Sequence, residues 1–226
     1  MLVTGAHETG AADRAALGQQ LAHFEQQLAM LTADTPPVER AALWLNIADA
    51  QVGLEQMEAA WNNARQALDA FVALEMWQEA VEACNLLYQC GQPASVAALG
   101  QGVWLAVTFP VQPELTMTML AHIVDETPPQ SDGAAVAAMV SHYVVDLRTE
   151  GEKHDSLSFL TTNLIARVAE RHSNIKDQAA LDAWMARLEL TDPQVFLPRL
   201  SQVINVMVQD QWWFDRDVLR AKLPDQ

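Results

Sequence analysis

The stretch LWLNIADAQVGLEQMEAAWNNARQAL, residues 43–68, decides the fold that we predict for this chain. It holds three small residues, Ala48, Ala60 and Ala67, at spacings of twelve and seven. Roughly 34 residues later, the length of one helical pair, the same two spacings recur at Ala83, Ser95 and Gly102. Small residues at these intervals let two antiparallel helices approach closely and let the next pair stack on them. The sequence therefore predicts stacked helical hairpins.

The remaining sequence is also typical of helices. Ala, Leu, Gln and Glu dominate, alternating β-branched stretches are missing, and Pro or Gly recurs at intervals of roughly 15–20 residues. Asp192 followed by Pro193 is typical of a helix start. The helices that we expect cover residues 13–31, 38–52, 57–73, 77–90, 94–107, 114–127, 131–147, 156–170, 176–188, 192–209 and 216–223. We predict an all-α protein of about ten helices, with a short α-solenoid followed by a helical carboxyl-terminal half.

A polar, charged segment between residues 149 and 155 is the best candidate for a domain boundary. It contains Gly151 and lacks a run of apolar residues. We therefore predict an amino-terminal part of helical hairpins over residues 1–149. A helical region over residues 150–226 is expected to pack on it.

Residues 43–68 resemble a tetratricopeptide repeat. The residues that match the types preferred by this family are Trp44, Ile47, Ala48, Ala60, Ala67 and Leu68. The chain departs from the family pattern at Gln51, where a Tyr is usual, at Ala64, where an aromatic is usual, and near Val72, where the closing Pro is missing. The next unit matches through its small residues and Leu86, so the resemblance covers about residues 38–107. It implies a stacked-helix scaffold with a concave groove for a peptide or protein.

The charge balance narrows the classes of partner. The chain has 29 acidic and 13 basic residues, a formal net charge of −16. A protein with this negative charge repels phosphate backbones and anionic lipids. The charge therefore disfavours nucleic acid and membrane partners, and it favours a protein partner with a basic surface.

Several features favour a cytoplasmic location. No apolar run approaches the roughly 20 residues of a membrane span, and residues 1–10 lack the basic start and apolar segment of a secretory signal. Cys84 and Cys90 lie six residues apart on one predicted helix, so they face different directions, and a reduced pair is expected.

No motif in the chain has the specificity of a catalytic, metal or cofactor signature. His142 with Asp146, and His122 with Asp125, share helix faces and could contribute to a metal site. Transition-metal sites usually need three or four ligands, and neither pair has a third partner at a characteristic spacing. We therefore predict no catalytic residue, no metal and no cofactor.

Adjacent aromatic residues near the carboxyl terminus are the candidate binding residues. Trp212 and Trp213 precede Phe214, and neighbours on a helix point about 100° apart, so we expect one indole to cap the helical stack and the other to be exposed. Tryptophan and arginine are enriched in interface hot spots. The candidate partner-binding residues are Trp212, Trp213 and Arg216. Asp215 is expected to cap the final helix, with Val218 and Leu219 facing inward.

Together these features predict a non-catalytic adaptor or assembly factor that holds a client protein in a groove. Small bacterial helical-repeat proteins often resemble accessory factors for building a larger enzyme, such as a metalloenzyme, and no residue here specifies which. The alternative is a small-molecule or metal-binding sensor or enzyme with a pocket between the two halves. A pocket enclosing His142 and Asp146 would favour the alternative, and an open groove would favour the adaptor.

Overall fold

The structure is a computed structural model, and it describes residues 10–223. Within that range the chain forms helices and no strands, which confirms the predicted all-α class. The helices are α1 (Ala11–Met30), α2 (Pro37–Gly53), α3 (Met57–Ala73), α4 (Trp77–Gln89), α5 (Ser95–Thr108), α6 (Pro113–Glu126), α7 (Asp132–Arg148), α8 (Gly151–Ser173), α9 (Gln178–Arg187), α10 (Pro193–Val208) and α11 (Arg216–Arg220). Most bounds agree with the sequence prediction to within three residues. The prediction that residues 1–10 lack a secretory signal concerns residues that lie almost wholly outside the described range.

The chain divides into two compact units, residues 1–95 and residues 96–226. This division differs from the boundary expected at residues 149 and 150, because α7 and α8 pack against each other within the second unit. The polar segment after residue 149 is not a linker. Gly151, with a φ of 60°, turns the chain directly into α8, whose first turns contain the polar residues. These polar residues lie on the solvent-exposed face of α8, as expected for an amphipathic helix.

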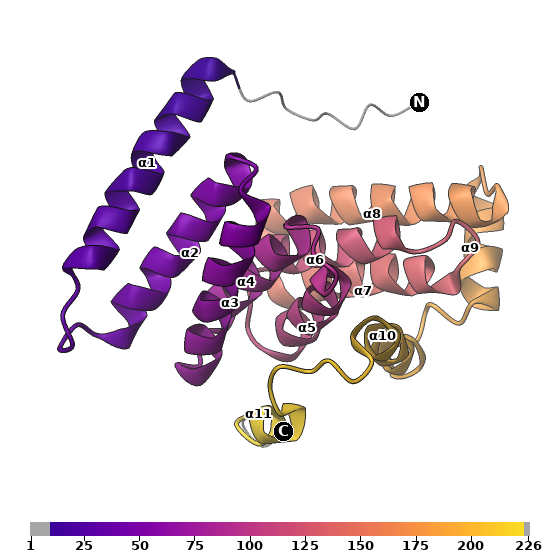
Figure 1. The fold of residues 1–226 in the computed structure, drawn as a ribbon. Coiled ribbons are helices and arrows are strands. Elements are labelled where there is room, and N and C mark those ends of the chain that lie inside the picture. Colours follow the sequence, from indigo (N-terminus) through magenta and orange to yellow (C-terminus); the bar gives the residue numbers. More distant parts are fainter. Residues whose placement is uncertain (1–9, 224–226) are drawn as a thin grey trace. The chain divides into compact units, whose positions relative to one another are not determined.

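The first unit is built from α1 to α4, each packed on its neighbour in sequence (Figure 1). Short three-residue turns join α2 to α3 and α3 to α4, which makes these neighbours antiparallel. Ala48, Ala60, Ala67 and Ala83 have no exposed surface, so the small residues singled out in the sequence lie where helices meet. Ile47, Leu68 and Phe71 fill the core around them.

The turns of the first unit use glutamate where a glycine is usual. Glu55 and Glu75 have φ values of 61° and 59°, the left-handed conformation that ends a helix. In both turns the amide three residues past the helix donates back to a carbonyl in the last turn, from Gln56 to Gln51 and from Met76 to Phe71. Gly53 has another role. A Cβ at Gly53 would meet Leu17 Cδ1 at 2.9 Å, so this glycine permits close approach of α1.

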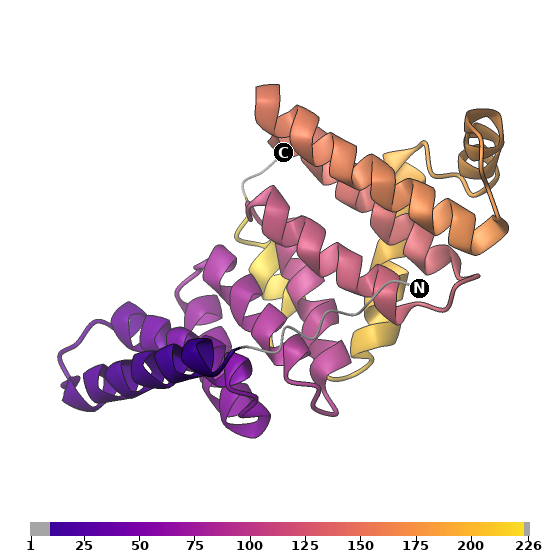
Figure 2. The same ribbon diagram turned by 90° about the horizontal axis from the view of Figure 1, so that it is seen from above.

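In the second unit α7 is the central helix. It packs against α6, α8 and α10 (Figure 2), and a nearly unbroken run from Gly133 to Val140 is buried, which includes four alanines. Asp192 caps α10 by accepting a hydrogen bond from the Gln194 amide at 2.9 Å, as the sequence predicts. α10 also crosses α5 closely, because a Cβ at Gly100 would lie 2.6 Å from Val208 Cγ2.

Arg148 ties the end of α5 to α7. Its Nη1 donates to the carbonyls of Ala106 and Val111, both at 2.9 Å, and its Nη2 donates to Val107 at 3.3 Å. The carbonyls of Ala106 and Val107 lie in the last turn of α5 and carry the negative end of its dipole, so a cation is stabilised there without a carboxylate partner. Burial nevertheless lowers the pKa of Arg148 below its usual value.

Candidate functional site

The candidate site is a groove of about 300 Å³ on the first unit, between α2 and α4. One wall is a stripe of α2, and the facing wall is a stripe of α4 with residues at spacings of three and four. The lining residues are Leu45, Asn46, Asp49, Glu82, Asn85, Leu86 and Gln89. The groove therefore combines two leucines with two carboxylates and three amides.

The hairpin geometry explains why these stripes face each other. The buried small residues of α2 and α3 let α3 pack tightly on α2, and α4 then packs on α3 and also contacts α2 directly. A partly buried pair strengthens the first contact, because Asn63 Nδ2 of α3 donates to Gln51 Oε1 of α2 at 2.9 Å. Helices α2 and α4 thus form the two walls of the groove, and both pack on α3.

The carboxylates of the groove have no cation paired with them in the described part of the first unit. Asp49 is exposed, and Glu82 accepts a hydrogen bond from the neutral Gln78 amide at 2.9 Å. Residues 1–95 contain twelve acidic and three basic residues, which gives a net charge of −9, and they contain no lysine. Arg14 and Arg65 are engaged by Glu55 and Asp69. The groove is consequently a region of negative potential, open to a cationic ligand.

The aromatic residues predicted as binding residues lie in a different place, on the second unit. α10 ends at Val208, so Trp212 and Trp213 belong to a non-helical connection to α11, and the expectation based on their sharing a helix does not apply. Both indoles are partly buried, rather than one buried and one exposed.

This connection is fastened to α5. Trp212 and Phe214 pack on Trp104, with ring centroids 6.1 and 5.6 Å away. Gln101 Oε1 accepts from the Trp213 amide at 2.8 Å, and Gln101 Nε2 donates to the Gln211 carbonyl at 3.3 Å.

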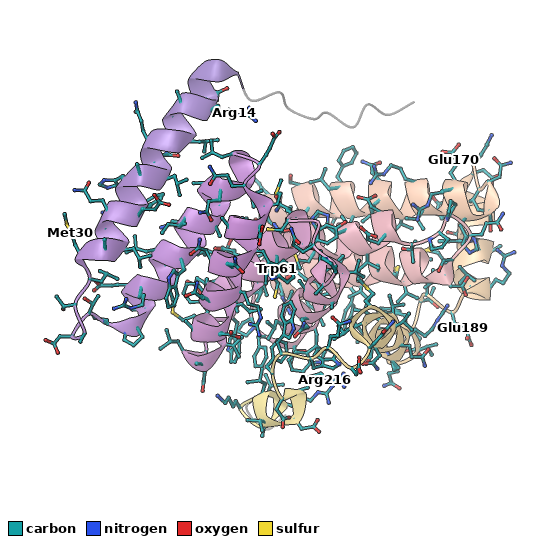
Figure 3. The ribbon with its side chains drawn as sticks, viewed as in Figure 1. Arg14, Met30, Trp61, Glu170, Glu189 and Arg216 are labelled. Atoms are coloured by element: carbon teal, nitrogen blue, oxygen red, sulfur yellow. The ribbon has the colours of Figure 1, made fainter. Side chains whose placement is uncertain are left out.

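Arg216, at the start of α11 (Figure 3), stacks over the Trp212 ring at 4.0 Å and donates to Asn205 Oδ1 at 2.9 Å. These contacts give Trp212 and Arg216 a structural role within the second unit. Asp215 caps α11 as predicted, by accepting from the amides of Asp217 and Val218. Leu219 is buried and Val218 is exposed, so the expectation that both face inward is wrong for Val218, since adjacent helical residues point about 100° apart.

The histidines form polar contacts with carboxylates, His142 within α7 and His154 between α8 and α7. His142 Nε2 lies 3.8 Å from Asp146 Oδ2, and His154 Nε2 of α8 lies 3.1 Å from Asp146 Oδ1. Burial lowers the pKa of His122, and the nearby Asp125 and Glu126 act in the opposite direction. Among residues 10–223 no group of three or more His, Cys, Asp or Glu side chains is arranged to hold a metal ion.

Sequence reasoning missed the groove residues because it followed apolar stripes. Asn46 and Asp49 are three residues apart on α2, and Glu82 and Asn85 are three apart on α4. Each pair therefore forms a polar stripe on one helix face. Their signal is that the two stripes occur on α2 and α4, the helices that flank α3 in the chain and that contact each other in the structure.

Comparisons with protein-family models, with curated proteins and with solved structures find no match to this chain. Over the described residues, none of the helices is both long enough and apolar enough to cross a bilayer.

Proposed function

We propose that this protein is a non-catalytic adaptor that holds a basic segment of a client protein in the groove between α2 and α4. The observation that carries the proposal is the position of Asp49 and Glu82 on opposite walls of that groove, without a paired cation. Lysine or arginine side chains of the client would lie against these carboxylates. The leucines of the lining would contact the apolar stems of the same side chains.

The amides of the groove suit an extended client backbone. Asn46, Asn85 and Gln89 each carry both donors and acceptors, which can pair with the N–H and C=O groups of a bound peptide. The overall charge of −16 would speed the encounter with a basic client. The resemblance of residues 38–107 to a tetratricopeptide repeat supports the same function, since that family presents a concave surface to peptides.

Affinity capture with a paired variant tests the proposal. In the groove variant, Asp49→Asn is combined with Glu82→Gln. In the control variant, Glu25→Gln is combined with Asp34→Asn, an equal change of charge at exposed residues of the first unit outside the groove. Wild type and both variants are immobilised, and proteins captured from a lysate of the source cells are quantified by mass spectrometry. The proposal expects a client that wild type and control retain and the groove variant loses.

A direct measurement accompanies the capture. A fluorescein-labelled peptide of about ten residues, with a Lys-Ser-Leu repeat, is titrated by fluorescence anisotropy, and a Glu-Ser-Leu peptide serves as the negative probe. Binding of the lysine peptide should weaken as salt screens the acidic groove. Equal affinity for the two peptides, or equal affinity of the groove and control variants, would contradict the proposal.

A further inference from the structure

A second, larger groove lies entirely within the second unit. Its volume is about 620 Å³, and its walls come from the start of α5, the end of α6, the start of α7 and one face of α10. The apolar lining residues are Val96, Ile123, Pro128, Val136, Val203, Val206 and Met207. Neither the acidic groove on the first unit nor the aromatic connection before α11 contributes to it.

The α10 wall presents apolar side chains to solvent at the spacing of a helix stripe. Val203, Val206 and Met207 lie three and four residues apart. Val206 is 74% exposed, more than any other exposed large apolar residue of the described chain. Small-molecule pockets bury most of their ligand, whereas walls this exposed leave a ligand open on one side. The exposure of the wall therefore favours a macromolecule over a small ligand.

The rim of the groove is acidic. Glu126 and Asp132 line it, and the exposed Asp125 lies next to Glu126 in the chain. Arg199 also lines the groove, but its Nη2 donates to Asp132 at 3.0 Å and its Nη1 donates to the Leu188 carbonyl. Asp132 is thus paired with Arg199 and also lies 3.2 Å from His172 Nε2, so Glu126 and the neighbouring Asp125 supply the remaining negative charge at the rim. Charge complementarity favours an occupant that is basic beside its apolar surface.

We propose that this groove binds an amphipathic helix of a partner protein, whose apolar stripe is bordered by lysine or arginine. Apolar residues at positions i, i+3, i+4 and i+7 of that helix lie against the valines of α10 and the end of α6. Its basic residues lie over Glu126. The inference does not depend on the groove between α2 and α4.

A titration with designed peptides tests this inference on the full chain. The probe is a fluorescein-labelled helix of about 18 residues, with Leu at i, i+3, i+4 and i+7 and Lys elsewhere. A scrambled peptide of the same composition and a Glu version of the helix are the comparison probes. Val206→Asp is the groove variant, and Val218→Asp is its matched control, because Val218 is a 57% exposed valine on α11 that does not line the groove.

The groove variant separates the apolar contact from general attraction. Val206→Asp adds a negative charge, so attraction by charge alone would strengthen binding of the Lys probe. The inference expects the opposite, a loss of affinity of about tenfold or more, while Val218→Asp leaves the affinity unchanged. Val206→Ser, which adds no charge, should lose affinity too. Circular dichroism confirms that each variant is folded.

Three results would overturn the inference: equal binding of the scrambled peptide, equal affinities of the two aspartate variants, or binding of the dye anilinonaphthalene sulfonate without binding of the helix. The last result would make the groove a small-molecule site. The combined Asp49→Asn and Glu82→Gln variant distinguishes this site from the proposed adaptor groove. It should keep its affinity for the helical probe while it loses affinity for the extended lysine peptide, so either proposal can fail alone.

Discussion

Replacing Gly100 by alanine should destabilise the second unit, although alanine is the better helix former. A Cβ at this position would lie 2.6 Å from Val208 Cγ2, closer than packed carbons approach, and 3.3 Å from Met207 Cβ, which is a tight contact. α10 would have to move, and overpacking of this kind costs about 1–3 kcal/mol. Alanine recovers about 1 kcal/mol relative to glycine inside a helix. We expect a net loss of up to about 2 kcal/mol in the free energy of unfolding, measured by urea denaturation followed by circular dichroism.

Two further variants make this expectation specific. At Gly18, a Cβ would meet nothing within 4 Å, so Gly18→Ala should stabilise the first unit by about 0.5–1 kcal/mol. Val208→Ala removes the atom that the new Cβ would strike, so Gly100→Ala should cost less in the Val208→Ala background. If Gly100→Ala stabilises the protein as Gly18→Ala should, or if Gly100→Ala and Val208→Ala are strictly additive, the close crossing of α5 and α10 is refuted.

The remaining predictions concern a turn, a buried cation and the two thiols. Glu189, which is exposed beyond α9 (Figure 3), has a φ of 54°; Glu189→Gly should therefore raise the free energy of unfolding by about 0.5–1 kcal/mol, and Glu189→Ala should give no such gain. The ammonium group introduced by Arg148→Lys cannot reach three carbonyls at once, so this substitution should lower the free energy of unfolding by about 1–3 kcal/mol. An unchanged free energy of unfolding would show that the guanidinium contacts are unimportant. Burial raises the pKa of Cys84 to about 12 and that of Cys90 to about 11. Neither thiol should react with Ellman's reagent at pH 8 until denaturant is added, and rapid reaction of the native protein would contradict their burial.

The sequence predicts the helices well because their signals are local. The apolar stripe of α3, with Leu68 and Phe71, and the cap of α10 at Asp192 both act within a few residues and appear as expected. The positions of the turns after α2 and α3 agree with the predicted helix ranges, but their conformation was not predicted, because glutamate carries no preference for the left-handed conformation that Glu55 and Glu75 adopt. Tertiary packing supports these turns where local preference does not.

The candidate sites were less predictable, since they depend on which helices meet. Asp49 and Glu82 are 33 residues apart in the chain, and the packing of α2, α3 and α4 brings them to one groove. Trp212 was predicted to be a binding residue because aromatic residues adjoin it in the sequence. In the structure it packs on Trp104, which lies more than 100 residues earlier in the chain. The spacing of residues in the sequence predicts which side chains share a helix face. Which other helix that face contacts depends on the tertiary fold.

The distribution of lysine has a practical consequence for experiments on this protein. Its three lysines are Lys153, Lys176 and Lys222, all in the second unit, whereas residues 1–95 contain none. Coupling through lysine amines to a sensor chip or a dye therefore leaves the side chains of the first unit unmodified, including the groove between α2 and α4. Such a surface presents the acidic groove intact to a client, and lysine acetylation or ubiquitination in a cell would likewise fall on the second unit alone.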